Sequence, residues 1–316
     1  MKPADRRPLG RTGLLVSPVC VGTSPLASMS ALYGYEVPAG RAETTIIAAL
    51  RSPFNFIDTS NNYGGGSAET RIGRALATAG GPPAGLVLAT KVDADPDTGD
   101  FSGERVRRSL EESLTRLGLD RVQLIYLHDP EYHLTFREAM ASGGPVRALI
   151  ELRDQGALAH LGVAGGPIGL MREFVATGVF DVVLSHNRFT LVDRSAEPLL
   201  GDACERGVAV VNGAPYGGGI LAKGPDAQPK YAYRPASAEL VGAVREMRRA
   251  CLARGISPAA AALQFSLREP RVASTVVGVS EPCRIAEIEA LMAERIPDDL
   301  WAELDSLAPG PGSWLS

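Results

Sequence analysis

The sequence lacks the patterns on which several classes of protein depend. Its four cysteines stand far apart without a CxxC pair, and its four histidines complete no zinc pattern. No apolar run approaches the roughly 18 residues of a membrane helix, and no apolar segment follows the basic residues near the N-terminus. We therefore expect reduced thiols, no metal site, no membrane span, no signal peptide and a cytoplasmic location.

The sequence also has no large excess of either positive or negative charge. The chain carries 32 Lys and Arg against 36 Asp and Glu, a net charge of −4, which gives no reason to expect a nucleic-acid or membrane partner. Its 316 residues, 45% of them hydrophobic, suffice for a large buried core. Because no linker or compositional break interrupts the chain, we expect one domain over residues 1–316, with the oligomeric state left open.

Short apolar segments alternate with helical ones along most of the chain. The pattern predicts strands at 15–21, 54–58, 86–91, 122–128, 158–164, 180–185, 208–212 and 273–277. Strict strand–helix alternation at this length favours a closed (β/α)₈ barrel, and no GxGxxG follows the first strand to support a dinucleotide-binding half. We expect an N-terminal β-hairpin before the barrel and an extra C-terminal helix near 298–307.

The stretch from Phe54 to Arg74, FNFIDTSNNYGGGSAETRIGR, is the centre of the predicted site. Side chains alternate along a strand, so Asp58 at the end of its strand shares a face with Phe54 and Phe56. The same rule brings Lys91 and His128 to the inner face at the ends of the next two strands. Tyr63 lies on the loop just beyond Asp58. Three adjacent strands thus end in ionisable groups at the edge where barrel enzymes hold their chemistry.

Physical chemistry suggests roles for these four residues. A tyrosine keeps its proton up to a pKa of about 10, and a nearby ammonium lowers that value by favouring the phenolate. Lys91 can supply this charge, Asp58 can hold Lys91, and His128 can hydrogen-bond to a substrate oxygen. Such a site moves a proton to or from an oxygen, and it needs a cofactor to exchange hydride or carbon.

Asp58, Tyr63, Lys91 and His128, in this order, resemble the catalytic tetrad of the aldo-keto reductases. The segments RPLGRTGLLVSPVCVGT, IDTSNNYGGGSAETRIGRAL and LDRVQLIYLHDP are similar to that family's opening hairpin, tyrosine signature and histidine strand. The resemblance covers nearly the whole chain. It implies a (β/α)₈ barrel, a nicotinamide cofactor and Tyr63 as general acid/base. Within the family, SHNRFTLVDRSA is most similar to the aldose 1-dehydrogenases and to pyridoxal 4-dehydrogenase.

The resemblance also implies which residues contact the cofactor and the substrate. The implied cofactor residues are Gly22, Thr23, Pro215, Gly219, Leu221, Gly278, Ser280 and Arg284. Ser185 is a further candidate, with His186 and Asn187 as alternatives, because it can compensate for the small residues Ala164 and Gly165 after the fifth strand. The implied substrate residues are Tyr63 and His128, and Tyr132 in the following loop is a candidate for the same pocket. Independently of the resemblance, Ser280 ahead of Pro282 is typical of a capped helix N-terminus, which suits an anion.

The chain departs from the family pattern at two places. Many relatives have Ser-Asn after the fifth strand to hold the nicotinamide amide, whereas this chain has Ala164 and Gly165 there. Many NADPH-dependent relatives have a lysine where Gly278 stands, which leaves Arg284 as the obvious cation for a 2′-phosphate. We therefore expect NAD to be preferred over NADP.

The expected function is an NAD(P)-dependent oxidation of a small aldose, such as L-fucose, D-threo-aldose or L-galactose, at C1 to the lactone. One alternative is an aldehyde or ketone reductase or a pyridoxal 4-dehydrogenase with the same four residues. Another is a non-catalytic barrel that binds nucleotide and regulates a partner. The intact set of four residues argues against the last.

Overall fold

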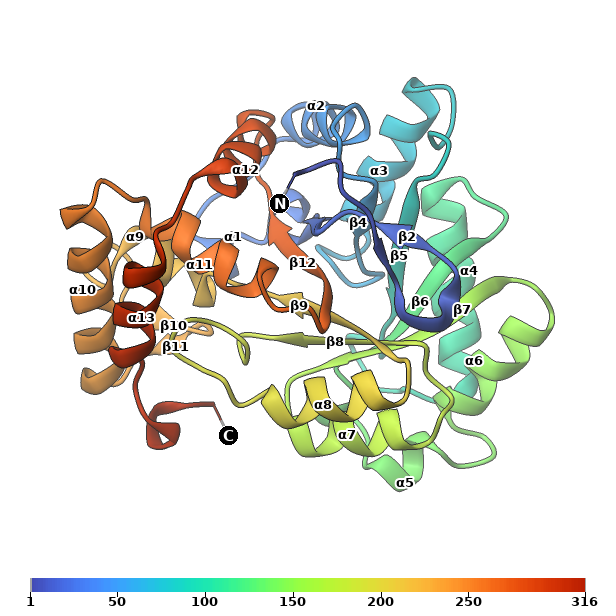
Figure 1. The fold of residues 1–316 in the computed structure, drawn as a ribbon. Coiled ribbons are helices and arrows are strands. Elements are labelled where there is room, and N and C mark those ends of the chain that lie inside the picture. The colour runs from blue at the N-terminus through green and yellow to red at the C-terminus, as the bar shows by residue number, and fades with distance from the viewer. Residues whose placement is uncertain (1, 316) are drawn as a thin grey trace.

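The computed structural model describes residues 2–315 and contains a closed barrel of eight parallel strands, which adjoin in the order β12-β3-β4-β5-β6-β7-β8-β9 (Figure 1). The strands are β3 (Val19–Gly22), β4 (Phe56–Asp58), β5 (Val87–Val92), β6 (Val122–His128), β7 (Leu158–Gly165), β8 (Val182–His186), β9 (Ala209–Gly213) and β12 (Val272–Gly278). The (β/α)₈ barrel expected from the sequence is confirmed.

Helices between the strands form the outer layer of the barrel (Figure 1). The longer ones are α2 (Ala39–Leu50), α3 (Ser67–Thr78), α4 (Gly103–Leu117), α6 (Pro145–Asp154), α7 (Ile168–Ala176), α8 (Glu197–Glu205), α10 (Ala238–Ala253), α11 (Pro258–Leu267), α12 (Cys283–Ala293) and α13 (Asp298–Ser306). Three helices of a single turn lie in loops: α1 (Ser30–Tyr33), α5 (Phe136–Ala139) and α9 (Ile220–Lys223). The last long helix, α13, is the extra C-terminal helix that the sequence predicted.

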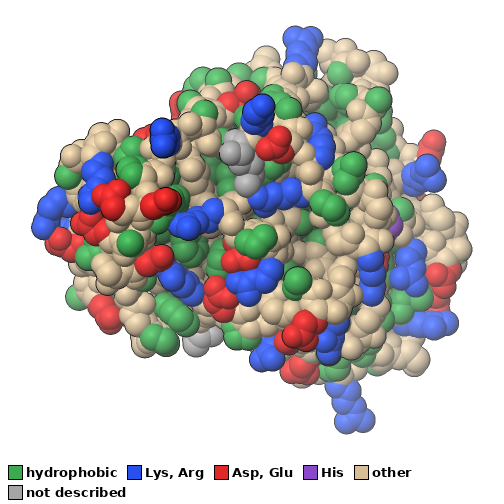
Figure 2. Space-filling model, viewed as in Figure 1, with side chains coloured by type: hydrophobic (Ala, Val, Ile, Leu, Met, Phe, Trp, Pro, Cys, Tyr) green, Lys and Arg blue, Asp and Glu red, His purple; other side chains and the backbone are tan. Residues whose placement is uncertain are grey.

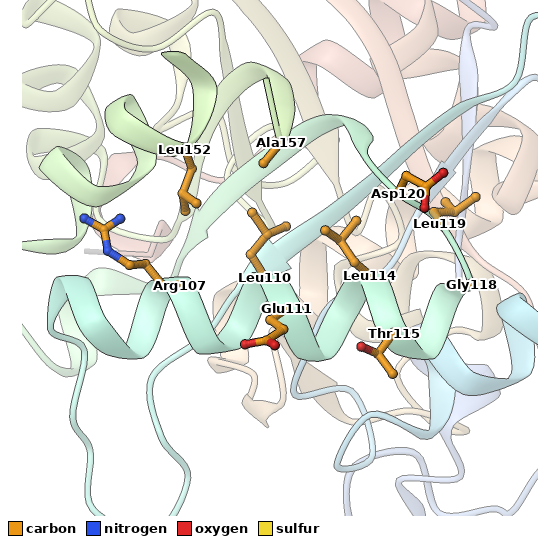
Figure 3. A pocket seen from close by; sticks show the side chains of 10 residues that line it. All are labelled: Arg107, Leu110, Glu111, Leu114, Thr115, Gly118, Leu119, Asp120, Leu152 and Ala157. Atoms are coloured by element: carbon orange, nitrogen blue, oxygen red, sulfur yellow. The ribbon is translucent and has the colours of Figure 1, made fainter. Parts of the chain in front are cut away.

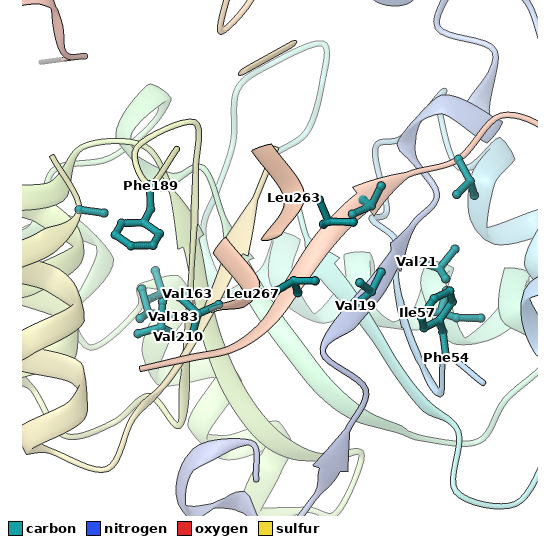
Figure 4. Packing of buried hydrophobic residues seen from close by; sticks show 14 of the residues in the cluster. Val19, Val21, Phe54, Ile57, Val163, Val183, Phe189, Val210, Leu263 and Leu267 are labelled. Atoms are coloured by element: carbon teal, nitrogen blue, oxygen red, sulfur yellow. The ribbon is translucent and has the colours of Figure 1, made fainter. Parts of the chain in front are cut away.

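Alternation along the strands divides the buried apolar side chains into two groups. One group fills the barrel and includes Phe56, Val87 and Leu124. The other lies between the strands and the helices, where Figure 4 shows residues such as Ile57 and Val183. Because neighbouring residues of each strand point to opposite faces, this division fixes which strand-end side chains face inward, and it confirms the alternation read from the sequence.

A two-stranded hairpin closes the N-terminal end of the barrel. Its strands, β1 (Arg7–Pro8) and β2 (Leu15–Val16), pair antiparallel, and Leu9 and Val16 belong to the apolar group inside the barrel. The expected single strand over 15–21 is therefore wrong in detail, since it is divided into β2 and β3. Pro18 separates the two because it has no N–H to donate to a sheet.

A second hairpin, β10 (Lys230–Tyr231) with β11 (Arg234–Pro235), lies in the long loop after β9 and was not predicted. The face of the molecule in Figure 2 has acidic and basic side chains interspersed. Within residues 2–315, no helix is long and apolar enough to cross a membrane. All four cysteines are free thiols.

Candidate active site

Lys91 holds together the end of β4 and the loop that follows it. Its buried ammonium donates to Asp58 Oδ1 at 2.7 Å, to the carbonyl of Thr59 at 2.7 Å and to the Tyr63 hydroxyl at 3.1 Å. The same Nζ lies 4.6 Å from the centre of the Tyr63 ring. With three acceptors around it, the ammonium is fully hydrogen-bonded. The ion pair with Asp58 is nearly sealed from solvent, the two side chains being 2% and 5% exposed.

The backbone explains why these groups meet. Asp58 in β4 lies beside Gly22 of β3 and Ala89 of β5, so its side chain ends next to that of Lys91, two residues further along β5. After Tyr63 the chain passes through three glycines with φ of +60°, +61° and +89°, Gly64 to Gly66, before α3 begins. A side chain at Gly64 would come within 2.4 Å of the Ala27 carbonyl, so this turn requires glycine.

His128 ends β6 on the same face and is held by Asp93, a residue not predicted from the sequence. Its Nδ1 lies 2.5 Å from Asp93 Oδ1, and the other oxygen of Asp93 accepts from Ser60 Oγ at 2.5 Å and from the Asn62 backbone N–H at 3.0 Å. The ring of His128 meets that of Tyr63 edge-on, with centroids 5.8 Å apart. All four predicted residues therefore lie close together at the C-terminal end of the barrel.

The electrostatics of Tyr63 differ from the expectation. Burial raises the pKa of its phenol well above the usual value, and the carboxylates of Asp58, Asp129 and Asp93 act in the same direction. The pKa of Tyr63 in the protein alone is therefore raised overall rather than lowered, because burial and three negative charges act against the effect expected of Lys91. Tyr63 holds its proton at neutral pH and is poised as a proton donor.

Two carboxylates influence His128 from opposite sides. Burial lowers the pKa of the imidazole, but Asp129 and Asp93 outweigh it and raise this pKa overall. Asp129 Oδ2 lies 3.6 Å from His128 Nε2, and its Oδ1 lies 3.8 Å from Nε2 of His186. Burial raises the pKa of Asp129, yet His128 and His186 lower it overall. Both carboxylates are thus ionised at neutral pH and favour a charged His128 ring.

Sequence reasoning missed Asp93 and Asp129, for different reasons. Asp93 lies two residues after Lys91, so the period-2 rule that selected Lys91 would also have placed it on the inner face. Asp129 lies one residue beyond His128, where alternation predicts the opposite face. Its backbone instead adopts a left-handed conformation with φ of +45°, which turns the carboxylate back toward the site and which the sequence does not signal.

A hollow of about 420 Å³ lies on the outside of the barrel between α4 and α6 (Figure 3). Leucines from both helices line it, among them Leu110, Leu114 and Leu152. None of the four predicted catalytic residues is among its lining residues. The convergence of ionisable groups, rather than the size of a hollow, therefore locates the candidate active site.

Comparison with known proteins agrees with this geometry. The model of the "Aldo/keto reductase family" matches residues 18–309, which include every residue discussed above in the site. The chain belongs to the aldo/keto reductase family. It is an oxidoreductase of that family, and the family's nicotinamide nucleotide is the expected cofactor class.

Several characterised members are similar to this aldo/keto reductase over most of its length. L-galactose dehydrogenase of Arabidopsis thaliana is 34% identical, over 93% of this chain and 90% of its own. Pyridoxal 4-dehydrogenase of Microbacterium luteolum is 30% identical, over 97% and 98%. D-threo-aldose 1-dehydrogenase of a Pseudomonas species is 31% identical, over 81% and 84%.

A solved structure supports the fold. An aldo-keto reductase from Bacillus halodurans, described as a holo form, superposes with a TM-score of 0.77 and covers 96% of both chains. Its sequence is 22% identical to this one, so this likeness concerns the arrangement of the chain alone.

The predicted cofactor residues of this aldo/keto reductase lie near the C-terminal ends of β3, β8 and β12 and in the loops that follow β3, β9 and β12. Gly22 and Gly278 are paired at the ends of the adjacent strands β3 and β12. A side chain at Gly278 would meet Pro25 at 2.9 Å. Leu221 is buried in α9, and Gly219 precedes it with a φ of +106°. The close approach of Pro25 therefore requires a residue without a side chain at Gly278.

Two buried polar atoms at the end of β8 fit an amide ligand. Among the described residues, neither Ser185 Oγ nor Asn187 Oδ1 has a hydrogen-bond partner. Ser185 is the penultimate residue of β8, and Asn187 directly follows the strand with a φ of +59°. Buried polar atoms are normally hydrogen-bonded, so these two are suited to the carboxamide that Ala164 and Gly165 have no side-chain group to bind.

The far end of the predicted cofactor site differs from expectation in one respect. Helix α12 begins at Cys283 with Pro282 as its N-cap and without a side-chain cap. Ser280 therefore does not cap this helix, and the backbone N–H groups of Arg284 and Ile285 in its first turn donate to the carbonyls of Glu281 and Pro282. Arg284 in the first turn pairs with Glu287 and keeps 37% of its side chain exposed.

Proposed function

We propose that this protein oxidises a small polyhydroxylated aldose at C1 to the lactone, with NAD or NADP as the hydride acceptor. The observation that carries the proposal is the chain of hydrogen bonds from Asp58 through Lys91 to Tyr63, with His128 at its side. Two of the similar proteins, L-galactose dehydrogenase and D-threo-aldose 1-dehydrogenase, support a sugar as the substrate.

Tyr63 is the proposed general acid/base. Among the titratable groups of the described site, only Tyr63 both accepts a hydrogen bond from Lys91 and lies against the ring of His128. In oxidation, Tyr63 takes up the hydroxyl proton of the substrate, and the Lys91 ammonium stabilises the phenolate that this role requires. In reduction, Tyr63 gives the proton back. His128 hydrogen-bonds to the same substrate oxygen and orients it.

A bound nicotinamide cofactor supplies the hydride acceptor or donor. The residues proposed to hold it are Gly22 and Thr23, Pro215, Gly219 and Leu221 after β9, and Ser185 near the end of β8. Ser185 and Asn187 are suited to the carboxamide by their unpaired buried oxygens. At the other end of the cofactor, the proposed contacts are the backbone at Gly278 and Ser280 and the side chain of Arg284.

NAD is the proposed preferred cofactor. A 2′-phosphate needs cationic or donor partners, and Gly278 has no side chain to supply one. Arg284 is the obvious cation, but Glu287 already partly neutralises it. An NADP⁺ preference of about tenfold or more, about 1.4 kcal/mol, would contradict this interpretation.

Tyr132 is the proposed rim of the substrate pocket, and its 69% exposure leaves it free to contact a ligand. Asp129, His186 and His128 add charged and hydrogen-bonding groups nearby. A lining of this kind suits a substrate with several hydroxyl groups, since carboxylates and imidazoles bind hydroxyls well.

The alternative within the same chemistry is a pyridoxal 4-dehydrogenase or an aldehyde reductase, which the 30% identity to pyridoxal 4-dehydrogenase supports. The test is a panel of L-fucose, L-galactose, D-threo-aldoses, pyridoxal and simple aldehydes, assayed with NAD⁺, NADP⁺ and the reduced cofactors. We expect the highest kcat/KM for an aldose with NAD⁺ and a lactone as the product. A higher kcat/KM for pyridoxal or a simple aldehyde would replace the aldose proposal.

The same panel tests the non-catalytic alternative. A regulatory barrel binds the nucleotide without turning over any substrate, whereas the proposed enzyme reduces NAD⁺ with at least one aldose. Nucleotide binding without turnover across the whole panel would favour the regulatory function. A single domain and a cytoplasmic location remain part of the proposal, and the oligomeric state is open.

A further inference from the structure

The buried carboxylate of Asp93 contacts three hydrogen-bond donors and lies outside the four residues assigned to the reaction. It is 6% exposed. Ser60 Oγ and the Asn62 backbone N–H both lie near Oδ2, and Nδ1 of His128 lies near Oδ1. A buried carboxylate without such partners would be costly, so the surrounding chain is arranged to keep this one ionised.

The charge state of Asp93 determines the proton on His128. Burial raises the pKa of this carboxyl, but His128, Ser60 and Asn62 outweigh burial and lower it overall. An ionised carboxylate only accepts hydrogen bonds. At an Nδ1–Oδ1 distance of 2.5 Å, Nδ1 must therefore carry a proton and donate it, whether the ring is neutral or charged.

The other nitrogen of the ring faces the reaction space. Nε2 lies 3.6 Å from Asp129 Oδ2, and the ring edge packs against Tyr63. The charged and titratable groups around the ring come from several elements: Lys91 and Asp93 at β5, Tyr63 after β4, Asp129 after β6, and His186 of β8 behind Asp129. With Nδ1 committed to Asp93, only Nε2 gains or loses a proton.

We propose that Asp93 is a positioning residue: by fixing the proton on Nδ1 of His128, it leaves Nε2 alone to decide how the ring contacts the substrate oxygen. The contact is a charge-assisted donation when Nε2 is protonated and an acceptance when it is not. The part that concerns the substrate rests on the proposed function, whereas the position of the ring proton does not.

Asp93→Asn changes this pattern in a defined way. The Asn62 backbone N–H still needs an acceptor, so the amide oxygen takes that position and the amide NH₂ faces His128. A donor facing Nδ1 requires a lone pair there, so the neutral ring carries its proton on Nε2 instead. The variant therefore presents an Nε2–H donor to the substrate both when the ring is neutral and when it is charged.

The first experiment reads the ring proton directly. Wild-type protein labelled with ¹⁵N-histidine is titrated by two-bond ¹⁵N–¹H NMR without cofactor, and His128 is assigned by its loss in His128→Gln. We expect the neutral wild-type ring to be protonated on Nδ1. The proton should move to Nε2 in Asp93→Asn and stay on Nδ1 in Asp97→Asn, a control that removes an exposed carboxylate from the same loop.

A neutral wild-type ring protonated on Nε2 would overturn the proposal, and this result needs no variant to fold except for assignment. The spectra require no turnover, so they stand even if the whole substrate panel fails and refutes the proposed function.

The second experiment measures kcat/KM against pH. In the wild type, we expect an inflection at the pH where Nε2 titrates in the NMR experiment. In Asp93→Asn, kcat/KM should fall about five- to tenfold on the acidic side, since a neutral donor replaces a charged one, and the inflection should disappear. No inflection at the titration pH in the wild type, or an unchanged inflection in the variant, would overturn the part that concerns the substrate.

Discussion

Replacing Lys91 by methionine tests how the site controls the proton of Tyr63. The ammonium is buried and lies 3.1 Å from the phenol oxygen. An opposite charge at such a distance shifts a pKa by about one to three units, or about 1.4–4 kcal/mol. Lys91→Met therefore adds this amount to a phenol pKa that burial and three carboxylates already hold above its usual value.

The sign of the effect follows from the role of the phenolate. Oxidation of an alcohol needs Tyr63 to accept a proton, so its rate rises with pH toward the Tyr63 pKa. A higher pKa moves this rise to more alkaline pH. We expect kcat for oxidation in Lys91→Met to be low near neutral pH and to recover in part as the pH increases.

The assay is a pH–rate profile of NAD⁺ reduction with the best aldose, measured for wild type, Lys91→Met and Lys91→Arg. Lys91→Arg keeps the positive charge and should move the profile less. A Lys91→Met profile with the wild-type shape would refute the reasoning that Lys91 tunes Tyr63.

The stability of the same variant needs a separate control. Removing one partner of a buried ion pair costs about 3–5 kcal/mol, because it leaves the other charge unpaired. Asp58→Asn/Lys91→Met removes both charges and should recover part of the free energy of unfolding that Lys91→Met loses. Urea unfolding of both variants separates loss of fold from loss of proton transfer.

Three further predictions concern single positions. Tyr63→Phe keeps the ring but has no proton to exchange, so kcat should fall by at least about 10²-fold with little change in cofactor affinity; near-normal turnover would remove Tyr63 from the mechanism. Arg284→Ala should weaken NADP⁺ binding much more than NAD⁺ binding in a fluorescence titration, and equal losses would show that Arg284 does not contact the 2′-phosphate. Gly162→Ala would bring a methyl group within 2.3 Å of the Tyr126 ring inside the barrel, so it should destabilise the fold by about 1–3 kcal/mol in urea unfolding, a cost that an unchanged midpoint would contradict.

The sequence predicted the barrel and the four central residues because both follow from local rules. Alternation along a strand assigns Asp58, Lys91 and His128 to one face, and parallel strands bring their C-terminal ends together. Neither inference needs a contact between distant side chains. Rules of this kind failed at Pro18, where a missing N–H divides a predicted strand, and at the hairpin formed by β10 and β11, which is too short to show a period.

The electrostatics were less predictable, because they depend on how many charges share one buried space. Lys91 alone suggested a lowered pKa for Tyr63, but Asp129 and Asp93 also face the phenol, and burial adds to their effect. Asp129 reaches the site only through a left-handed backbone. Such a turn is decided by the packing of the loop rather than by residue spacing.

The most direct test of the central claim follows the hydrogen at C1 of the sugar. Purified enzyme is incubated with NAD⁺ and an aldose deuterated at C1, and the products are analysed by mass spectrometry and NMR. We predict a lactone without deuterium and a reduced cofactor that carries the deuterium on its nicotinamide ring. Turnover that leaves the deuterium on the sugar, or no cofactor reduction with any aldose of the panel, would contradict the account.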